Sequence, residues 1–207
     1  MIRMLHTADW HLGQTFFGFD RTEEHQDFLD WLAEEIRLKE IDALIVAGDI
    51  FDVSNPSAAS QRMYYQFIHK VTAENPNLQI VIVAGNHDSA ARLEAPLPLL
   101  QAMRTEVKGV VRKGKDGEID FDHLTVELKN RQGETEVLCM AVLFCVRAII
   151  PQCRQTAILM RRECASFISV SSVCCAIAGK RIRLLLQSGI YRRRDRRLPK
   201  KIIANGR

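Results

Sequence analysis

The hydrophobic positions along the first half of the chain follow two alternating patterns. Uninterrupted apolar runs occur in MIRMLHTAD, IDALIVAGD and LQIVIVAGNHD, and each ends in polar residues. Runs of this kind are typical of strands that are buried on both faces of a sheet. Between the runs, residues 22–36 and 58–74 place apolar side chains three and four positions apart, as amphipathic helices do. This alternation predicts a layered α/β fold with a mainly parallel sheet.

The stretch after the third strand has a less regular pattern. A short helix is expected from about Ser89, and Pro96 and Pro98 interrupt its course because proline lacks the N–H that a helix interior requires. Residues 119–144 then alternate apolar and polar positions on both sides of NRQGE. We expect two strands joined at this turn, forming an antiparallel hairpin that continues one edge of the same sheet.

Length and composition permit one large domain, or one domain followed by a tail. The chain has 207 residues, 47% of them hydrophobic, which is enough for a packed core. The net charge of +4 conceals a sharp division. Residues 1–144 hold 14 basic and 23 acidic side chains, whereas residues 145–207 hold 15 basic and 2 acidic ones. We therefore expect an N-terminal domain in residues 1–144 and consider residues 145–207 separately.

Cysteine usage and hydropathy indicate a cytoplasmic protein. Residues 1–144 contain a single cysteine, Cys139, and the adjacent Cys174 and Cys175 fit neither a disulfide framework nor a zinc site. The first residues reach Asp9 too soon for a secretory signal. No segment provides the roughly 18 apolar residues that are needed to cross a bilayer.

Each predicted strand ends in residues of the types that bind metal ions. The first is followed by Asp9 and His11, the second by Asp49, and the third by Asn86 and His87. Ligand sites of open parallel sheets lie beyond the carboxyl ends of the strands, so we expect these three loops to converge. Asp9 and His11 lie two positions apart, which in an extended backbone places both side chains on one side. Glycine before Asp49 and before Asn86 allows sharp turns.

The ligand types favour a hard or borderline divalent ion. Carboxylate, imidazole and amide groups suit Mn²⁺, Fe²⁺ or Zn²⁺, and there is no thiolate to select a softer metal. We expect Asp9 and His11 to bind one ion, Asn86 to bind a second, and Asp49 to bridge the two, roughly 3.5–4 Å apart. His87 then lies beside the pair, as a proton donor to a leaving alkoxide or a stabiliser of the transition state.

Each motif taken alone has an ordinary structural explanation. An aspartate at a strand end is often a helix cap, and Asn-rich turns are common in loops. We interpret Asp52 and Asp88 in this way, as turn or cap residues, and His6 as a hydrogen-bonded core histidine. His25 and His69 fall in helical patterns, and we expect them at the surface or in helix packing. The three motifs together, each after an apolar strand, favour a metal site over a purely structural role.

The segments HTADWHLGQ, DALIVAGDIFD and IVIVAGNHDS resemble the first three motifs of the calcineurin-like metallophosphoesterases. The resemblance covers about residues 1–144, and HTADWHLG followed by EEHQDFLDWL is similar to DNA-nuclease subunits within that family. It places the family's metal ligands at Asp9, His11, Asp49 and Asn86 and its catalytic histidine at His87. The resemblance implies a nuclease with two Mn²⁺ ions, exonucleolytic (3′–5′) on duplex DNA and endonucleolytic on single strands. Such subunits work as homodimers with an ATPase subunit in recombination and repair.

One part of the family's pattern is absent. The family completes its two-ion site with later GH and GHxH motifs, but residues 145–207 contain no histidine. The resemblance therefore implies an incomplete second ion site, weak metal retention and impaired nuclease activity. Two alternatives stay open: an inactive, truncated fragment, and a small-molecule phosphodiesterase or phosphatase with the same ligands. The net charge of −9 over residues 1–144 gives no electrostatic support for DNA binding.

The basic segment, residues 145–207, has three explanations. It is a small basic domain with a nucleic-acid patch at YRRRDRRLPKK, a disordered cationic tail, or the product of a shifted reading frame. Codons chosen for a one-base shift near Phe144 restore a polar loop after AVLF and a later GHL that resembles the missing motif. We favour the frameshift, so that the fold is truncated and its C-terminal tail non-native. The nucleotide sequence across codons 140–210 tests this hypothesis.

Overall fold

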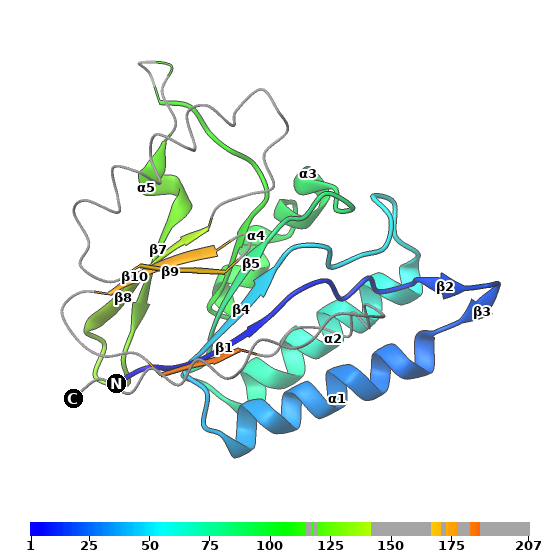
Figure 1. The fold of residues 1–207 in the computed structure, drawn as a ribbon, viewed down its shortest axis with the longest axis horizontal. Helices are drawn as coiled ribbons and strands as arrows, with labels where there is room; N and C mark the ends of the chain where they lie inside the picture. The colour runs from blue at the N-terminus through cyan, green and yellow to red at the C-terminus, as the bar shows by residue number, and fades with distance from the viewer. Residues whose placement is uncertain (115–116, 118–119, 142–166, 171–172, 178–182, 187–207) are drawn as a thin grey trace, which may run out of the picture.

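The fold was described from a computed structural model that carries side chains. It describes residues 1–114, 117 and 120–141, and the backbone of residues 167–170, 173–177 and 183–186. Figure 1 shows the arrangement of these parts: a parallel sheet has two long helices on one face and a second sheet on the other. The layered α/β class predicted from the sequence is confirmed.

The parallel sheet is built from the apolar runs. Its strands are β1 (Arg3–Thr7), β4 (Ala43–Ala47), β5 (Gln79–Val83) and β6 (Thr105–Lys108), which pair in that order, and β11 (Arg183–Leu186) pairs with the outer edge of β1. All of these described pairings are parallel. The sequence did not predict β6, because its four residues, TEVK, are too short and too polar for a buried apolar run.

The two long helices cover one face of the parallel sheet. They are α1 (Thr22–Leu38) and α2 (Ala58–Glu74), and the shorter α3 (Ala90–Glu94) and α4 (Leu97–Ala102) lie against β6. A side-chain cap starts α2, because the Ser57 hydroxyl accepts a hydrogen bond from the backbone N–H of Ser60 in its first turn. The helices therefore lie where the sequence predicted them, and α3 ends before the two prolines.

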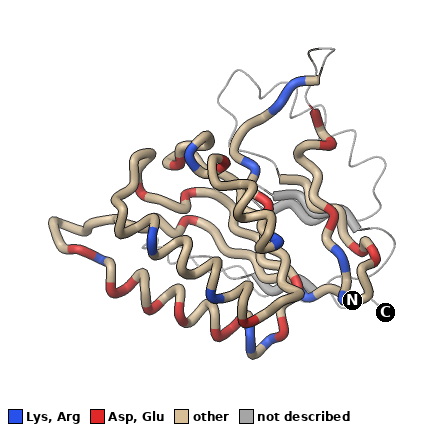
Figure 2. Tube along the Cα trace, turned by 180° about the vertical axis from the view of Figure 1, so that it is seen from behind, with Lys and Arg blue, Asp and Glu red and all other residues tan. Residues whose placement is uncertain are grey.

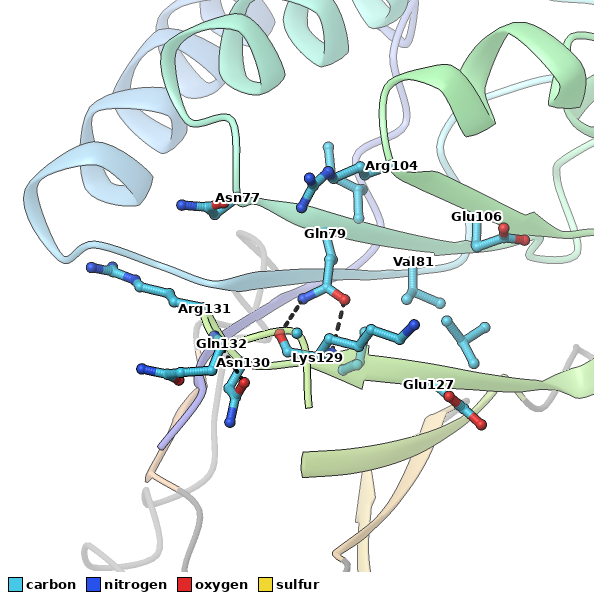
Figure 3. A pocket seen from close by; sticks show the side chains of 14 residues that line it. Asn77, Gln79, Val81, Arg104, Glu106, Glu127, Lys129, Asn130, Arg131 and Gln132 are labelled. Carbon is cyan, nitrogen blue, oxygen red and sulfur yellow. Dashed lines mark hydrogen bonds between the residues drawn. The ribbon is translucent and has the colours of Figure 1, made fainter. Parts of the chain in front are cut away.

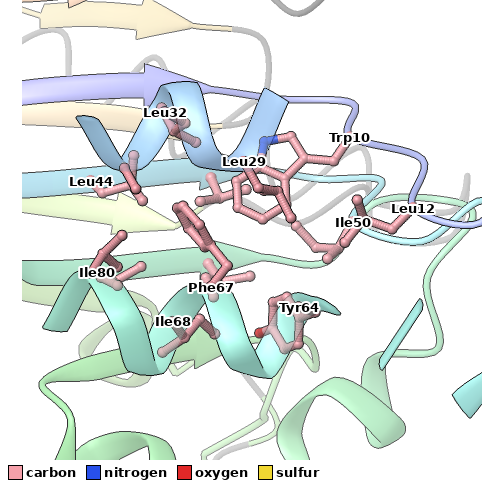
Figure 4. Packing of buried hydrophobic residues seen from close by; sticks show 14 of the residues in the cluster. Trp10, Leu12, Leu29, Leu32, Leu44, Ile50, Tyr64, Phe67, Ile68 and Ile80 are labelled. Atoms are coloured by element: carbon pink, nitrogen blue, oxygen red, sulfur yellow. The ribbon is translucent and has the colours of Figure 1, made fainter. Parts of the chain in front are cut away.

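A continuous apolar core lies between these helices and the sheet. In Figure 4 the Trp10 indole packs among side chains of α1, α2 and the strands. Its ring meets Phe67 edge to face, with centroids 5.4 Å apart, and its Nε1–H donates to Thr7 Oγ1 at 3.0 Å. The indole anchors the first strand-end loop to the helices, because it stands between Asp9 and His11 in the sequence.

The predicted hairpin forms, but its place in the fold was predicted wrongly. It consists of β7 (Thr125–Lys129) and β8 (Thr135–Ala141), preceded by the short α5 (Phe121–Leu124). With β10 (Val173–Ile177) and β9 (Phe167–Val170) it forms a separate antiparallel sheet instead of continuing the edge of the parallel one.

The reason lies in the second face of the parallel strands, which is also apolar. Met4, Ile45 and Val83 on that face form a buried cluster with Leu128 and Val137 of the hairpin. Strands that are apolar on both faces require a cover on each side. Burial of this second face therefore favours stacking of the hairpin over edge pairing.

A small hairpin that the sequence analysis did not predict follows the first strand-end loop. It comprises β2 (Thr15–Phe16) and β3 (Phe19–Asp20), and both turn residues, Phe17 and Gly18, have positive φ, at 49° and 83°. Positive φ at both central residues is the feature of a type I′ turn. Such turns favour Asn, Asp or Gly at the first central position, where this chain has Phe17, so the sequence did not indicate the turn.

The proposed boundary between residues 1–144 and 145–207 stays a prediction, as does the shifted reading frame. Parts of the second segment that the structure describes are the strands β9, β10 and β11: β10 pairs with β8 and β9, and β11 pairs with β1. Strand pairing does not test a reading frame, which only nucleotide sequence decides. No helix within the described part of the chain is long and apolar enough to span a membrane.

Replacing Phe67 by alanine tests this description of the core. The ring is 4% exposed and contacts Trp10, so we expect the free energy of unfolding to fall by about 3–5 kcal/mol. Urea denaturation followed by circular dichroism measures the change. Leu99→Ala is the control, because its side chain is 71% exposed and the loss should stay within about 0.5 kcal/mol. Equal losses in the two variants would contradict the packing described.

Candidate metal centre

Three loops meet at the carboxyl edge of the parallel sheet, as predicted. Backbone hydrogen bonds continue the strand pairing into them: Asp9 N–H donates to Gly48 O at 3.1 Å, and His11 N–H donates to Asp49 O at 2.9 Å. Gly48 N–H in turn donates to Val83 O at 2.9 Å. Main-chain bonds therefore hold the loops after β1 and β4 side by side, and fix the start of the loop after β4 beside the last residue of β5.

Left-handed backbone conformations are concentrated in these loops. Asp9, His11 and Asp49 have φ of 56°, 48° and 49°, and Gly48 has φ of 84°. The extended backbone predicted between Asp9 and His11 is therefore wrong. Aspartate tolerates the left-handed region better than most residues, although each such residue costs about 1–3 kcal/mol. The conformation turns the side chains of the first two loops toward each other.

Asp9, His11 and Asp49 offer ligand atoms that all lie within 4.8 Å of one another. His11 Nε2 is 3.9 Å from Asp49 Oδ2. Burial raises the pKa of the Asp9 carboxyl, and the charge of Asp49 raises it further, while His11 and His87 oppose the shift. Two carboxylates that repel each other beside an imidazole form a site whose charge a divalent cation would balance.

His87 and Asp52 extend the cluster on the other side of His11. One donor atom each from His11, Asp52 and His87 lie within 4.8 Å of one another, and the two imidazole rings meet edge to face at 4.9 Å. Asp52 Oδ1 lies 3.2 Å from His11 Nδ1, without hydrogen-bond geometry, and accepts from Gln14 Nε2 at 3.2 Å. The sequence analysis interpreted Asp52 as a turn or cap residue and did not place it at the centre. Its position three residues after Asp49 in the same loop was the available indication.

His87 is also held by the main chain of Asp52. Its Nδ1 donates to the Asp52 carbonyl oxygen at 2.7 Å, because a carbonyl can only accept. This bond raises the pKa of His87, as do the charges of Asp49, Asp52 and Asp88. The residue is exposed, so its Nε2 is the ring nitrogen available to a substrate.

Asn86 and Asp88 flank His87 in the third loop. Asn86 is exposed, and within the described residues no hydrogen bond or ion pair joins it to Asp9, His11 or Asp49. The Asp88 carboxylate accepts only backbone N–H groups, so its interpretation as a turn residue fits. Burial raises the pKa of Asp88, against the effect of these hydrogen bonds.

The remaining predicted histidines lie away from the cluster. His6 is buried in β1 as expected, but its Nε2 has no hydrogen-bond partner among the described residues, which corrects the prediction of a hydrogen-bonded residue. His25 is buried under the first turns of α1, and burial lowers its pKa. His69 is exposed on α2. Two of the three therefore serve packing.

A hollow of about 640 Å³ lies at the opposite edge of the sheet. Figure 3 shows it between β5, β6 and the hairpin β7–β8, where the Gln79 side chain bonds both the N–H and the carbonyl of Lys129. Its charged lining includes Arg104, Glu106 and Arg131. The candidate metal ligands of the three loops do not line this hollow.

Metal-ligand side chains beyond the ends of parallel strands define the class to which the chain belongs. The chain is a member of the calcineurin-like phosphoesterase family, whose model matches residues 2–143. It is similar to SbcD, one of the subunits of the nuclease SbcCD, from Rhodobacter capsulatus, with 42% identity over 153 residues, which are 74% of this chain and 38% of that protein.

Proteins of the same name in two other bacteria are also similar. The identity is 42% over 106 residues in Escherichia coli K12, covering 51% of this chain and 26% of that protein. It is 43% over 98 residues in Bacillus subtilis strain 168, covering 47% and 25%. The chain thus matches between a quarter and two fifths of the length of these curated relatives.

Membership of this family implies divalent metal ions, and the donor set of the three loops fits them. Carboxylate oxygens and imidazole nitrogens are ligands for Mn²⁺, Fe²⁺ or Zn²⁺, and Cys139, the cysteine whose side chain is described, is buried in the other sheet.

Gly85→Ala tests the tight contact between two of the loops. A Cβ at Gly85 would lie 2.2 Å from Asp49 Oδ1 and 2.3 Å from its backbone nitrogen, so the loops must separate. We expect this overpacking to lower the free energy of unfolding by about 1–3 kcal/mol or more, as measured by urea denaturation. Gly133→Ala is the control: no atom lies within 4 Å, and its φ of 83° leaves a backbone cost of about 1–2 kcal/mol. A smaller loss for Gly85→Ala than for Gly133→Ala would contradict the contact.

Proposed function

We propose that the chain is a metal-dependent phosphodiesterase of the DNA-nuclease type. The observation that supports this most directly is the meeting of Asp9, His11 and Asp49 with His87 at one edge of the sheet. The relatives are nuclease subunits by name. Their activity is proposed for this chain because of that similarity.

The proposed centre holds two divalent metal ions, and we propose that both are Mn²⁺. Asp9 and His11 would hold one ion, Asn86 would help to hold the other, and Asp49 would be shared. When bound, such ions neutralise charge on a phosphodiester and activate water as the nucleophile. The left-handed turns at Asp9, His11 and Asp49 set these donors in place beforehand, so little conformational freedom is left to be lost on binding.

His87 would deliver a proton to the leaving oxygen. Its Nδ1 proton is committed to the Asp52 carbonyl, so the acid would be the imidazolium form, which carries a second proton on Nε2 and passes it to the leaving oxygen. A positioned acid of this kind contributes about 10²–10⁴-fold to rate. Asp52 would orient both histidines at once, with its carbonyl on His87 and its carboxylate beside His11.

The surface charge does not identify the substrate. Figure 2 shows acidic positions along the length of α1, and residues 1–144 are net negative. A phosphate backbone gains no general attraction from such a surface. DNA, a homodimeric state and a partner ATPase of the SbcC type are proposed because the relatives are subunits of a nuclease called SbcCD.

Metal retention and activity should both be weak in the 207-residue chain. No histidine follows His123 in the sequence, so additional imidazole ligands for the second ion are missing from residues 124–207. An ion held by an amide and one shared carboxylate has few protein ligands compared with a typical catalytic site. The family function and a poorly active chain are therefore compatible.

Separate measurements of metal binding and cleavage test the proposal. Calorimetric titration with Mn²⁺ should show binding by the unaltered chain, at least about tenfold weaker binding by Asp49→Asn, and nearly unchanged binding by His87→Gln. Cleavage of a linear duplex, at the low level expected, should be lost in both variants. His69→Gln is the matched control, because this histidine is exposed on α2 and should change neither readout.

Three results would count against parts of the proposal. Absence of Mn²⁺ binding by the unaltered chain would refute the metal centre. Robust duplex cleavage would refute the expected impairment. Hydrolysis of bis(p-nitrophenyl) phosphate without any cleavage of DNA would instead support the small-molecule alternative.

A further inference from the structure

The Asp88 carboxylate lies between the second and third loops of the candidate centre. Its Oδ2 accepts hydrogen bonds from Ile50 N–H at 3.1 Å and Gly85 N–H at 2.9 Å, and its Oδ1 accepts from Phe51 N–H at 3.0 Å. Two of these donors belong to the loop after β4, and Gly85 belongs to the loop after β5. One side chain therefore bonds both loops.

The bonded N–H groups stand next to the proposed functional residues. Ile50 and Phe51 are the two residues between Asp49 and Asp52, and Gly85 directly precedes Asn86. Fixing these main-chain groups fixes the relative positions of the side chains beside them. The three hydrogen bonds therefore determine the spacing between the ligands of one loop and those of the other.

Asp49 makes the reciprocal connection. Its Oδ1 accepts a hydrogen bond from His87 N–H at 2.9 Å, so a carboxylate from the loop after β4 bonds the loop after β5. Asp88 does the same in the opposite direction. The Asp49 side chain, however, is also a proposed metal ligand, whereas Asp88 is bonded only to backbone, so Asp88 can keep the loops together independently of a metal ion.

Asp88 does not have the usual role of an acid at this place in the chain. The helix α3 begins just after it, with Ser89 at its N-cap, but the Asp88 carboxylate bonds no N–H of that helix. Both of its oxygens are engaged by N–H donors, and it belongs to neither group of candidate metal ligands found among the described residues. Its hydrogen bonds instead join the loop after β4 to the loop after β5.

We propose that Asp88 is a positioning residue that sets the distance between Asp49 and the pair Asn86–His87 before a metal ion binds. This inference rests on the metal centre proposed above and assigns Asp88 no direct contact with metal or substrate. Interactions behind the ligands of a metal site typically change metal affinity by about 10–100-fold. The positioning role of Asp88 can therefore be measured as a change in the affinity for Mn²⁺.

The test compares Asp88→Asn with Asp42→Asn in the full 207-residue chain. Asparagine keeps the shape of aspartate but replaces one oxygen by an NH₂ group, so in either orientation a backbone N–H of the Asp88 network faces another donor. Asp42 is the matched control at the opposite edge of the sheet. Its carboxylate accepts from Arg3 N–H and from Arg131 Nε–H, both at 2.9 Å; Asp42 is buried and Asp88 is half-buried.

We expect both variants to lose thermal stability but only one of them to lose Mn²⁺ affinity. Both variants should unfold at a lower Tm without metal, because each leaves a hydrogen-bond donor unpaired. Only Asp88→Asn should weaken Mn²⁺ binding, by at least about tenfold, in calorimetric titration. Hydrogen exchange of the metal-free chain should accelerate at Ile50, Phe51 and Gly85 in Asp88→Asn and stay unchanged there in Asp42→Asn.

Several outcomes would overturn the inference. Wild-type Mn²⁺ affinity in Asp88→Asn would show that the spacing does not depend on this residue. An equal loss of affinity in Asp42→Asn would assign the effect to general destabilisation. Unchanged exchange at the three amides would show that Asp88 does not hold them. Failure of the unaltered chain to bind Mn²⁺ would remove the metal centre itself, a result distinguishable from the others because it appears before any substitution.

Discussion

Main-chain hydrogen bonds that continue past the ends of β1, β4 and β5 are the constraint on which the candidate centre depends. Asp9 and His11 bond the carbonyls of Gly48 and Asp49, and Gly48 bonds the carbonyl of Val83. Because these bonds extend the parallel pairing, the loops after β1 and β4 keep the register of the strands, and hydrogen bonds of the Asp49 and Asp88 carboxylates join the loop after β5 to the loop after β4. The side chains then need only local turns to meet, and left-handed residues supply those turns.

The two apolar faces of the parallel sheet explain why the site lies at an edge. Helices α1 and α2 bury one face, and the hairpin β7–β8 buries the other. Polar groups on either face would be desolvated without partners. Only the strand ends can present carboxylates and imidazoles to solvent, and at the carboxyl ends the loops are long enough to hold them. The hollow of about 640 Å³ lies at the other edge, and the candidate metal ligands do not line it.

Much of this arrangement could be predicted from the sequence, for physical reasons that also explain the failures. The long elements α1 and α2 have strong 3.6-residue periodicity, and their positions were predicted correctly. The strand β6 has four residues of mixed polarity and gave no pattern. Sequence alternation showed that β7 and β8 pair, but not which surface they cover, because that depends on the apolar second face of distant strands. Asp52 was missed because its contacts with His11 and His87 exist only after the loops meet.

All of the candidate ligands come from one continuous part of the chain, residues 9–88, and this determines which part of the family's site the chain contains. Asp9 and Asp88 are the outermost of the residues discussed at the centre, and the main-chain bonds between the loops join residues within that span. Among the described residues, the contacts that bring the candidate ligands together therefore involve no residue of the basic segment. A nuclease with a weak second ion and an inactive fragment would share these loops and differ only in the ligands that complete the second ion. Mn²⁺ affinity measures the loops that both alternatives share, whereas DNA cleavage depends on the ligands of the second ion, in which the two alternatives differ.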